Sequence, residues 1–406
     1  MKRIPALRSA ICSACGHNVA VPFLDSPSQP LATLAWPSSA EIARNLPKLP
    51  LDFVRCVDCG HIFNMAFEYD EVPYSEKPNL MFNSGAIWSE FIQGVRRAML
   101  DRLPEQPVVV EVGHGDGSFL AALAEGRPAG RYIGFDPNGS LHCSPRIELR
   151  RELFDTAQLA ELKPDLIVSR HVLEHLVNPL GFLQRVSFAA ECLGQRPLTY
   201  LETPCIDNAL TTGRTVDFYY EHSSHFTTQS FSRMLSRCGA DVLEVGHGYG
   251  GEVVYGFIVL GAPDAAVATA HAAGAFREQA EAALDTIQGQ LAALHDSGQT
   301  VAIWGGTGKS AAFICRYGVD ALRFPIVVDS DVKKIGTFVA GSGQEIRFRD
   351  WLLDHPAEVI IIPPQWRAAD IVEEMAKTGI VAEKVLIEHD SRLIDFHLAV
   401  HPYRLA

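Results

Sequence analysis

Long apolar runs and an excess of basic charge are both missing from this sequence of 406 residues. It has no run of about 18 apolar residues, the length a membrane-spanning helix needs, and no apolar run follows Met1-Lys2-Arg3 to form a secretory signal. Its 35 Lys and Arg are outnumbered by 48 Asp and Glu, which gives a net charge of −13. This acidic net charge argues against nucleic acid and anionic membranes as main partners. We expect a cytoplasmic protein that acts on a small molecule.

Charged residues are few, at 20%, against 47% hydrophobic residues, so the chain has ample material for a buried core. At this length we expect two or three domains. Five of the nine cysteines stand alone, and in a reducing compartment we expect them to be buried free thiols. These are Cys143, Cys192, Cys205, Cys238 and Cys315.

The other four cysteines form two CxxC-Gly pairs, which are typical of metal-binding knuckles. They are Cys12, Cys15, Cys56 and Cys59. Four thiolates are the tetrahedral ligand set that Zn²⁺ prefers, and a closed set leaves no position open for catalysis. The sequence therefore predicts one structural zinc. His17 and His61 each lie two residues beyond a pair, and we expect them to be surface or supporting residues rather than ligands.

Alternating strand and helix signals begin near residue 107 and predict an α/β fold with a doubly wound parallel sheet. They follow a helical pattern over 85–100. The expected strands are 108–112, 132–135 and 166–168, and the expected helix is 118–125. A long Ala- and Glu-rich helix over 264–295 follows. Beyond it, apolar strands at 301–304, 325–329 and 358–362 predict a second, smaller α/β domain.

A glycine-rich loop follows the strand at 108–112 and opens a helix. Its pattern is ExGxGxG, with Glu111, Gly113, Gly115 and Gly117, rather than the GxGxxG of dinucleotide-binding proteins. Asp136-Pro137 ends the next strand, where an acid can accept both hydroxyls of a ribose. This combination resembles the cofactor-binding signature of class I methyltransferases, which implies S-adenosylmethionine as the cofactor.

A further segment over 166–179 resembles the fourth-strand region of such enzymes, where Arg170 and His171 would bracket the methionine part of the cofactor. We interpret His175 as a packing or capping residue. We do not interpret Glu174 and His175 as a metal pair.

Taken together, the motifs resemble the C-methyltransferases of deoxysugar biosynthesis over nearly the whole chain. The segments at 219–226, 329–336 and 361–366 also resemble that family. The resemblance implies three parts: a zinc-binding domain over 1–75, a class I methyltransferase core over 76–262, and a bridging helix with a Rossmann-like substrate-binding domain over 263–406. The chain departs from the family at His225, where Tyr is usual, and over 340–346, which puts the substrate's identity in doubt.

The resemblance implies methylation of a carbon next to a ketone on a nucleotide-linked sugar. His222 matches the base that removes the α-proton, and a histidine suits this task because its pKa lies near neutrality. Tyr219 would donate a hydrogen bond to the developing oxyanion. Glu221 would orient the pair of His222 and Tyr219, and Tyr74 would close over the active site. The alternatives are that 217–226 is an aromatic core segment and that His225 is the base.

The C-terminal segment Gly306-Thr307-Gly308-Lys309-Ser310 only partly matches a nucleotide-hydrolysing loop, because position 303, where such a loop needs glycine, is Ile. The turn could still hold a phosphate at a helix N-terminus, and the expected contacts to a nucleotide-sugar are Lys309, Ser310 and Lys333. Two other functions remain open: an O- or N-methyltransferase for a glycan or natural-product precursor, and a zinc-bearing binding module without activity.

Overall fold

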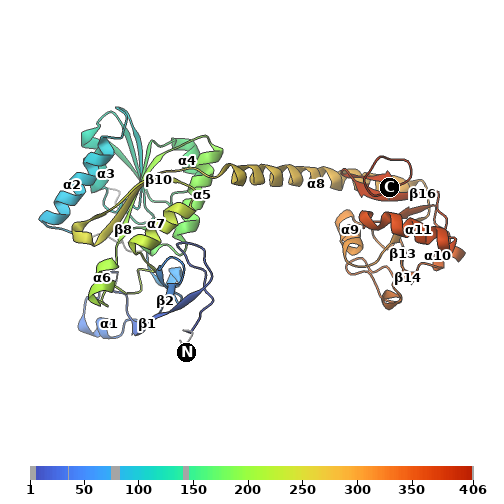
Figure 1. Cartoon of the computed structure of the whole chain (residues 1–406), viewed down its shortest axis with the longest axis horizontal. Helices are drawn as coiled ribbons and strands as arrows, with labels where there is room; N and C mark the ends of the chain where they lie inside the picture. The colour runs from blue at the N-terminus through green and yellow to red at the C-terminus, as the bar shows by residue number, and fades with distance from the viewer. Residues whose placement is uncertain (1–5, 35, 75–82, 140–145, 405–406) are drawn as a thin grey trace. The chain divides into compact units, whose positions relative to one another are not determined.

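The computed structural model describes residues 6–34, 36–74, 83–139 and 146–404, and it divides into two compact units, 1–268 and 269–406. Figure 1 traces both along the chain. The border between the units falls inside α8 (Asp264–Asp296), the long helix that the sequence predicts. Within the described ranges, no helix is both long and apolar enough to cross a membrane.

The first unit is built on a seven-stranded sheet with the order β6-β5-β4-β7-β8-β11-β10. The first five strands in this order, β6, β5, β4, β7 and β8, run parallel to one another. Strand β11 is antiparallel to both of its neighbours, β8 and β10. This is the class I methyltransferase arrangement that the sequence predicts. The strands are β4 (Val108–Val112), β5 (Arg131–Phe135), β6 (Ile147–Arg150), β7 (Leu166–Arg170), β8 (Leu198–Pro204), β10 (Asp241–Gly248) and β11 (Val253–Val259).

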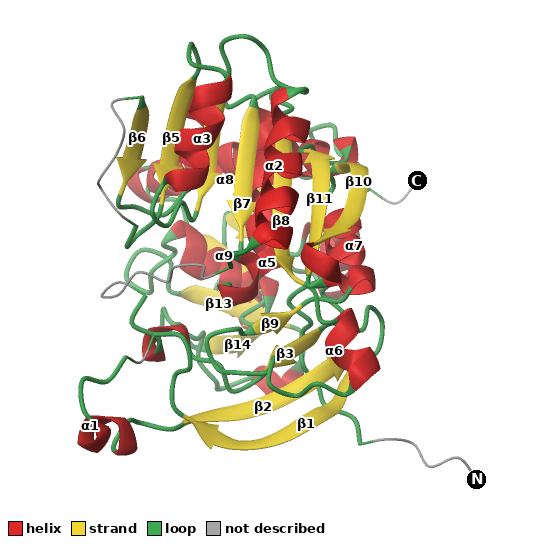
Figure 2. Ribbon diagram, turned by 90° about the vertical axis from the view of Figure 1, so that its left-hand side faces the viewer, coloured by secondary structure: helices red, strands yellow, loops and turns green. Residues whose placement is uncertain are grey.

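Helices cover both faces of this sheet, because successive strand residues point to opposite sides. Val109 packs on the side of α2 (Ala86–Leu100) and α3 (Ser118–Gly126). Val110 packs on the side of α4 (Thr156–Leu162), α5 (Pro179–Cys192) and α7 (Thr228–Arg237). Figure 2 shows α2 and α3 in front of the sheet. With both faces buried, the polar groups that remain available gather at the strand ends.

The strand order reverses between β4 and β7, since β5 and β6 extend the sheet on one side and β7 and β8 on the other. In open α/β sheets, ligands bind outside the carboxyl ends of the strands at such a switch point. The residues that follow β4 and β7 therefore line the candidate site.

A second, four-stranded sheet has the order β1-β2-β3-β9. Its first three strands come from the cysteine-rich N-terminal region, but β9 comes from the segment that follows α6 (Asp207–Thr212). The N-terminal region is thus attached to the methyltransferase core by the pairing of β3 with β9, which lies in the connection between β8 and β10 of the larger sheet. The strands are β1 (Ala20–Gln29), β2 (Leu49–Cys56), β3 (Ile62–Asn64) and β9 (Ser224–His225), with α1 (Ala40–Arg44) between β1 and β2 and η1 (Tyr69–Glu71) after β3.

The second unit is the smaller α/β domain that the sequence predicts, with a sheet ordered β14-β13-β12-β15-β16-β17. All its pairings are parallel except that of β17 with β16. The elements are β12 (Val301–Trp304), α9 (Lys309–Tyr317), β13 (Ile326–Asp329), η4 (Val332–Lys334), β14 (Ile346–Phe348), α10 (Trp351–Asp354), β15 (Val359–Ile361), η5 (Gln365–Arg367), α11 (Ala368–Thr378), β16 (Lys384–His389) and β17 (Arg392–Asp395).

The expectation of buried lone thiols is correct for Cys205 and Cys238 and wrong for Cys192 and Cys315, which are exposed. Cys192 is the last residue of α5, and Cys315 lies on the solvent-facing side of α9. Helical position, rather than the polarity of a thiol, decides their exposure. Cys143 lies outside the described residues.

Candidate active site and zinc centre

The two cysteine pairs form two matching turns. In each, the amide of the first cysteine donates to the carbonyl of a histidine, Cys12 to His17 and Cys56 to His61, both at 2.8 Å. In each, the glycine that follows the pair has φ = 77°, which a residue with a Cβ adopts only with strain. The CxxC-Gly spacing therefore folds locally into a knuckle that presents two sulfurs on one side.

The four sulfurs converge in a buried cluster that fits zinc. Sγ of Cys12 lies 3.6 Å from Sγ of Cys59, and Sγ of Cys15 lies 3.7 Å from Sγ of Cys56. A tetrahedral zinc site with Zn–S bonds of about 2.3 Å separates its sulfurs by about 3.8 Å. The hydrogen bond between Cys12 and Cys59 lowers the pKa of Cys59 to about 6 and raises that of Cys12. A cation would remove this competition and let all four act as thiolates.

His17 and His61 occupy the same place in the two knuckles but differ in surroundings. His17 is exposed, whereas His61 is fully buried. Nε2 of His61 contacts the hydroxyls of Ser13 and Ser224 at 3.1 and 3.2 Å. Both are thus outside the four-sulfur set, as the sequence predicts.

The glycine-rich loop wraps the carboxyl end of β4 closely. The amide of Gly113 donates to the carbonyl of Phe135 at 2.7 Å, and that of Gly115 donates to Oδ2 of Asp136 at 3.0 Å. Gly113 has φ = 76°, and a methyl group there would come within 2.3 Å of Cγ2 of Val172. The glycine-rich loop therefore contacts both Asp136, at the end of β5, and Val172, in the turn after β7. Gly117 immediately precedes α3, and Pro137 is exposed beside Asp136.

Glu111, which opens the loop, is 2% exposed. Burial raises its pKa to about 8, against the opposing charge of Arg170. Its Oε2 accepts no hydrogen bond from any residue in the described part of the chain. A buried carboxylate oxygen without a donor is costly, and the ammonium group of an amino-acid ligand would supply the missing donor and charge.

Arg170 and His171, at the end of β7, belong to a buried ion cluster. Nε of Arg170 lies 3.0 Å from Oε1 of Glu202, and its guanidinium lies 4.0 Å from the ring centre of Phe119. His171 lies between Glu174, at 3.3 Å, and Glu202, at 3.4 Å. Burial would lower the pKa of His171, but its bonds to the two carboxylates outweigh burial and raise it to about 9. His171 is therefore an imidazolium near neutral pH, held at φ = 52°.

Tyr219 and His222 form a close pair in the segment between α6 and β9. The phenol oxygen lies 2.9 Å from Nε2 of His222. Burial lowers the pKa of His222 well below its ordinary value, and the neighbouring His175 and His225 add to the effect. Burial also raises the pKa of Tyr219. At neutral pH the pair therefore consists of an uncharged imidazole and an intact phenol, which is the combination of a base and a hydrogen-bond donor.

Glu221 and Tyr74 hold this segment in place. Oε1 of Glu221 accepts from the amides of Thr33 and Leu34 at 2.6 and 3.2 Å, so the carboxylate fastens an N-terminal loop. The hydroxyl of Tyr74 donates to the carbonyl of Glu221 at 2.9 Å, and Nδ1 of His175 lies 2.8 Å from the same oxygen. The main chain immediately before His222 is thus fixed from two sides.

His225, the alternative base, packs inside the small sheet. Its ring lies between those of Phe53 and Phe218, at 5.3 and 4.8 Å between centres, and its Nε2 contacts the carbonyl of Asp217 at 3.0 Å. Burial lowers its pKa to about 4. His222 and His225 differ in surroundings in a way that the sequence pattern does not reveal.

In the second unit, Lys309 begins α9 and lies 3.7 Å above the ring of Trp366. Ser310 is buried, and its hydroxyl donates to the carbonyl of Trp304 at 3.4 Å. Lys333 is exposed on η4. The structure thus places the three expected substrate contacts in different surroundings, with the Ser310 hydroxyl directed back to β12.

Two groupings escaped the sequence-based predictions. Potential metal-ligand atoms of Glu174, His175 and His222, a carboxylate oxygen and two ring nitrogens, lie within 4.8 Å of one another. His222 follows His175 by 47 residues in the sequence. In the second unit, Nζ of Lys334 lies 2.9 Å from Oδ2 of Asp329, which also accepts from the amide of Gly306 at 3.3 Å. The first has no local sequence signal. In the second grouping, a loop glycine amide donates to the acid at the end of the next strand, Gly306 to Asp329, as Gly115 does to Asp136 in the first unit. The sequence signal for it is a Gly-rich turn followed by a strand that ends in Asp.

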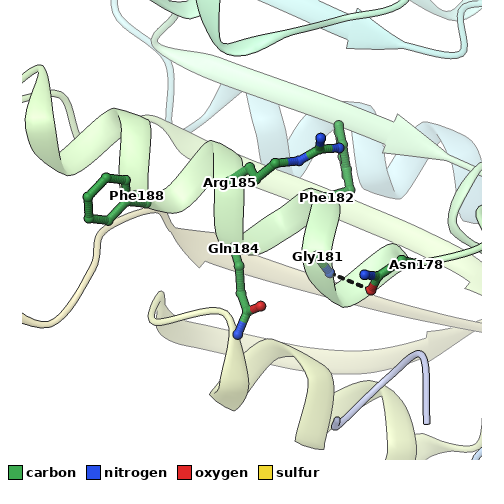
Figure 3. Close-up of a pocket in the computed structure, with 6 residues that line it drawn as sticks. All are labelled: Asn178, Gly181, Phe182, Gln184, Arg185 and Phe188. Atoms are coloured by element: carbon green, nitrogen blue, oxygen red, sulfur yellow. Dashed lines mark hydrogen bonds between the residues drawn. The ribbon is translucent and has the colours of Figure 1, made fainter. Parts of the chain in front are cut away.

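A surface hollow of about 540 Å³ lies along α5 (Figure 3). It is lined by Asn178, Gly181, Phe182, Gln184, Arg185 and Phe188. None of the residues expected at the active site lies in it, so this hollow has no part in the site described above.

Two family models match the chain. "Methyltransferase domain" matches residues 87–245, and "C-methyltransferase C-terminal domain" matches residues 263–385. Among curated proteins, the chain is similar to the release factor glutamine methyltransferase of Mycobacterium leprae (strain TN), with 50% identity over 42 residues. That stretch is 10% of this chain, and it spans 15% of the length of that relative.

Among solved structures, the chain is similar to a SAM-dependent methyltransferase from Aquifex aeolicus, with 14% identity and a TM-score of 0.30 over 44% of this chain and all of that one. It is also similar to the magnesium protoporphyrin IX methyltransferase of Synechocystis PCC 6803, solved with bound SAH, with 15% identity and a TM-score of 0.32 over 44% of this chain and 90% of that one. The family matches are the more informative result. The chain carries an S-adenosylmethionine-dependent methyltransferase domain followed by a C-methyltransferase C-terminal domain, and together the two support a C-methyltransferase family.

Proposed function

We propose that this protein is an S-adenosylmethionine-dependent C-methyltransferase that methylates the carbon next to the ketone of a nucleotide-linked deoxysugar. The match to the C-methyltransferase C-terminal domain favours carbon as the acceptor atom. The observation that carries the proposal is the 2.9 Å contact between Tyr219 and His222 at the carboxyl edge of the larger sheet. Removal of an α-proton needs a base and a donor to the enolate oxygen at one place.

The chain's own residues divide the work as follows. Uncharged His222 takes the proton from the α-carbon, and the phenol of Tyr219 donates a hydrogen bond to the oxygen on which the negative charge develops. S-adenosylmethionine supplies the electrophilic methyl group when bound. Asp136 would hold the ribose of this cofactor, and Glu111 would face its ammonium group.

The supporting residues keep the base in position. Tyr74 and His175 hold the carbonyl of Glu221, while the carboxylate of Glu221 holds the loop at 33–34. Preorganisation of this kind matters because a displacement of about 1 Å can reduce a rate roughly 100-fold. We further propose that the four-cysteine cluster binds a structural zinc and that Lys309 and Lys333 contact the nucleotide part of the substrate.

The test is proton exchange at the substrate carbon. The protein is incubated in D₂O with a panel of nucleotide-linked keto-deoxysugars, with and without cofactor, and deuterium is located by NMR. We expect deuterium at the carbon beside the ketone, loss of this exchange in His222→Ala, and an unchanged cofactor Kd in that variant. Methyl transfer to oxygen or nitrogen without exchange would show the alternative enzyme class, and an unaltered exchange rate in His222→Ala would remove this residue from the mechanism.

A further inference from the structure

The second knuckle continues directly into the strand that pairs with the catalytic segment. Strand β3 starts at Ile62, shortly after Cys59, and it runs antiparallel to β9, with Ile62 opposite His225 and Phe63 opposite Ser224. The amide of the next residue, Asn64, donates to the carbonyl of Ser223 at 3.0 Å. The backbone just beyond His222 is therefore attached to the knuckle's own strand.

A triangle of polar side chains adds a second connection. Nε2 of His61 lies 3.1 Å from the hydroxyl of Ser13 and 3.2 Å from that of Ser224, and the two hydroxyls lie 3.2 Å apart. Ser13 belongs to the first knuckle, His61 follows the second, and Ser224 lies on β9. His61 is fully buried and Ser224 is 2% exposed, whereas Ser13 is partly exposed. The bond between His61 and Ser224 is therefore the one shielded from competition by water.

The knuckle geometry dictates where the ring of His61 lies. The His61 carbonyl accepts from the amide of Cys56 at 2.8 Å, and the His61 amide donates to the sulfur of Cys59. The other ring nitrogen, Nδ1, is buried and has no partner among the described residues. The imidazole of His61 is therefore held by hydrogen bonds only through its Nε2, among the residues that the structure describes. A change at the cysteine sulfurs would displace this imidazole and, with it, Ser224.

The opposite side of the same strand is fixed by the methyltransferase fold. The hydroxyl of Ser223 donates to the carbonyls of Glu174 and Leu176, at 3.2 and 3.1 Å. Successive side chains of an extended segment point to opposite sides, so Ser223 contacts the turn after β7 while Ser224 contacts the knuckles. His222 precedes this double attachment by one residue, and its ring lies 4.9 Å from that of His175.

We propose that Ser13, His61 and Ser224 are positioning residues through which the zinc-bearing knuckles fix the imidazole of His222. The inference rests on the proposed roles of His222 and of zinc. It assigns the zinc centre a task beyond local folding: the metal holds the two knuckles together, the knuckles hold the triangle, and the triangle holds the strand that follows the base. Loss of the metal, by chelation or by thiol oxidation, would then switch off turnover through the catalytic strand.

The matched variants are His61→Ala and His17→Ala, because the two histidines take the same place in the two knuckles and only His61 contacts Ser224. Ser224→Ala is a milder second variant that leaves both knuckles intact. For each full-length protein, four measurements are made: zinc content, cofactor Kd by calorimetry, steady-state kinetics for kcat and KM, and amide hydrogen exchange over 222–226. Exchange over 301–304 in the second unit serves as an internal reference.

We expect His17→Ala to match the wild type in all four measurements. We expect His61→Ala and Ser224→Ala to retain one zinc and the wild-type cofactor Kd, while exchange over 222–226 rises about tenfold and kcat falls about tenfold at unchanged KM for the cofactor. We also expect Ser13→Ala to behave like Ser224→Ala and Ser13→Thr, which keeps the hydroxyl, to restore kcat. Chelation of zinc from the wild type should raise exchange over the same amides and leave the reference unchanged.

Wild-type exchange over 222–226 in both His61→Ala and Ser224→Ala would overturn the proposal, as would exchange unaffected by chelation. Failure of the proposed function has a different signature. Turnover that survives in His222→Ala would remove the base, whereas the exchange measurements on the triangle require no substrate and would stand by themselves.

Discussion

The phenol oxygen of Tyr219 lies 2.9 Å from Nε2 of His222, three residues along the chain, in a segment with almost no regular secondary structure. The neighbouring Tyr220 turns the other way, and its hydroxyl accepts from the amide of Glu68 at 2.9 Å. Two adjacent tyrosines therefore serve different parts of the molecule: the first belongs to the candidate active site and the second fastens the N-terminal region.

Replacement of Tyr219 by Phe should reduce kcat about 10- to 100-fold, because it removes a donor to the developing oxyanion while it preserves the ring. The cofactor Kd should stay within about twofold of the wild type. Tyr220→Phe is the matched control: we expect it to lower stability by about 1 kcal/mol and to leave kcat unchanged. Steady-state kinetics and urea unfolding measure the two effects, and equal kcat in the two variants would contradict the assignment.

Stability should fall as the pH rises from about 6.5 to 9, because the pKa of His171 rises from its ordinary 6.5 to about 9 in the fold. A raised folded pKa gives stability that is complete below the unfolded pKa and is lost as pH passes the folded value. The loss attributable to this residue is at most about 3 kcal/mol. Urea unfolding at about pH 6 and pH 9.5 measures it.

The His171→Asn variant isolates the contribution of that residue from other titrations. It should be less stable than the wild type at the lower pH, and the difference should shrink at the higher pH. A wild-type advantage that does not change between the two values would show that His171 does not keep its proton between Glu174 and Glu202.

Replacement of Gly113 by Ala should weaken cofactor binding at least about tenfold, because φ = 76° strains any residue with a Cβ and the new methyl group would press on Val172. Gly94→Ala is the control. It lies within α2, and its added methyl group would have no heavy atom within 4 Å, so we expect equal or slightly higher stability. Calorimetric titration with S-adenosylmethionine measures the binding, and equal affinity in the two variants would argue against a cofactor crevice at this loop.

Protein purified under reducing conditions without chelator should contain one zinc per chain, and Cys56→Ser should lose it together with several kcal/mol of stability in the N-terminal region. Cys192→Ser, which changes an exposed thiol outside the cluster, should retain the metal. Atomic emission gives the stoichiometry. Metal-free wild-type protein with native stability would contradict the assignment.

Much of the architecture follows from local pattern. The strand at 108–112 and the long helix after 263 were predictable, because consecutive apolar residues and an Ala-rich run each have one favourable backbone state. The parallel sheet followed from the alternation of strands and helices. The exposure of Cys192 and Cys315 did not follow, since it depends on which helix face the rest of the fold covers.

The active segment was only partly predictable. The sequence pointed to Tyr219, His222 and Glu221 as a group, but it could not assign the carboxylate of Glu221 to the backbone at 33–34. It indicated a packing or capping role for His175 but could not connect this residue to the segment, where its Nδ1 lies 2.8 Å from the Glu221 carbonyl oxygen. These contacts join residues that are 46 to 188 positions apart, and no local spacing encodes such a distance.

The two histidines that follow the knuckles mark the boundary between what the sequence determined and what the tertiary structure decided. The chain by itself determined the turns, because CxxC-Gly imposes the same hydrogen bonds and the same left-handed glycine at both sites. Only the tertiary structure distinguished exposed His17 from buried His61, because burial depends on which other segment packs against a turn. Here that segment is β9, which arrives from more than 160 residues further along the chain.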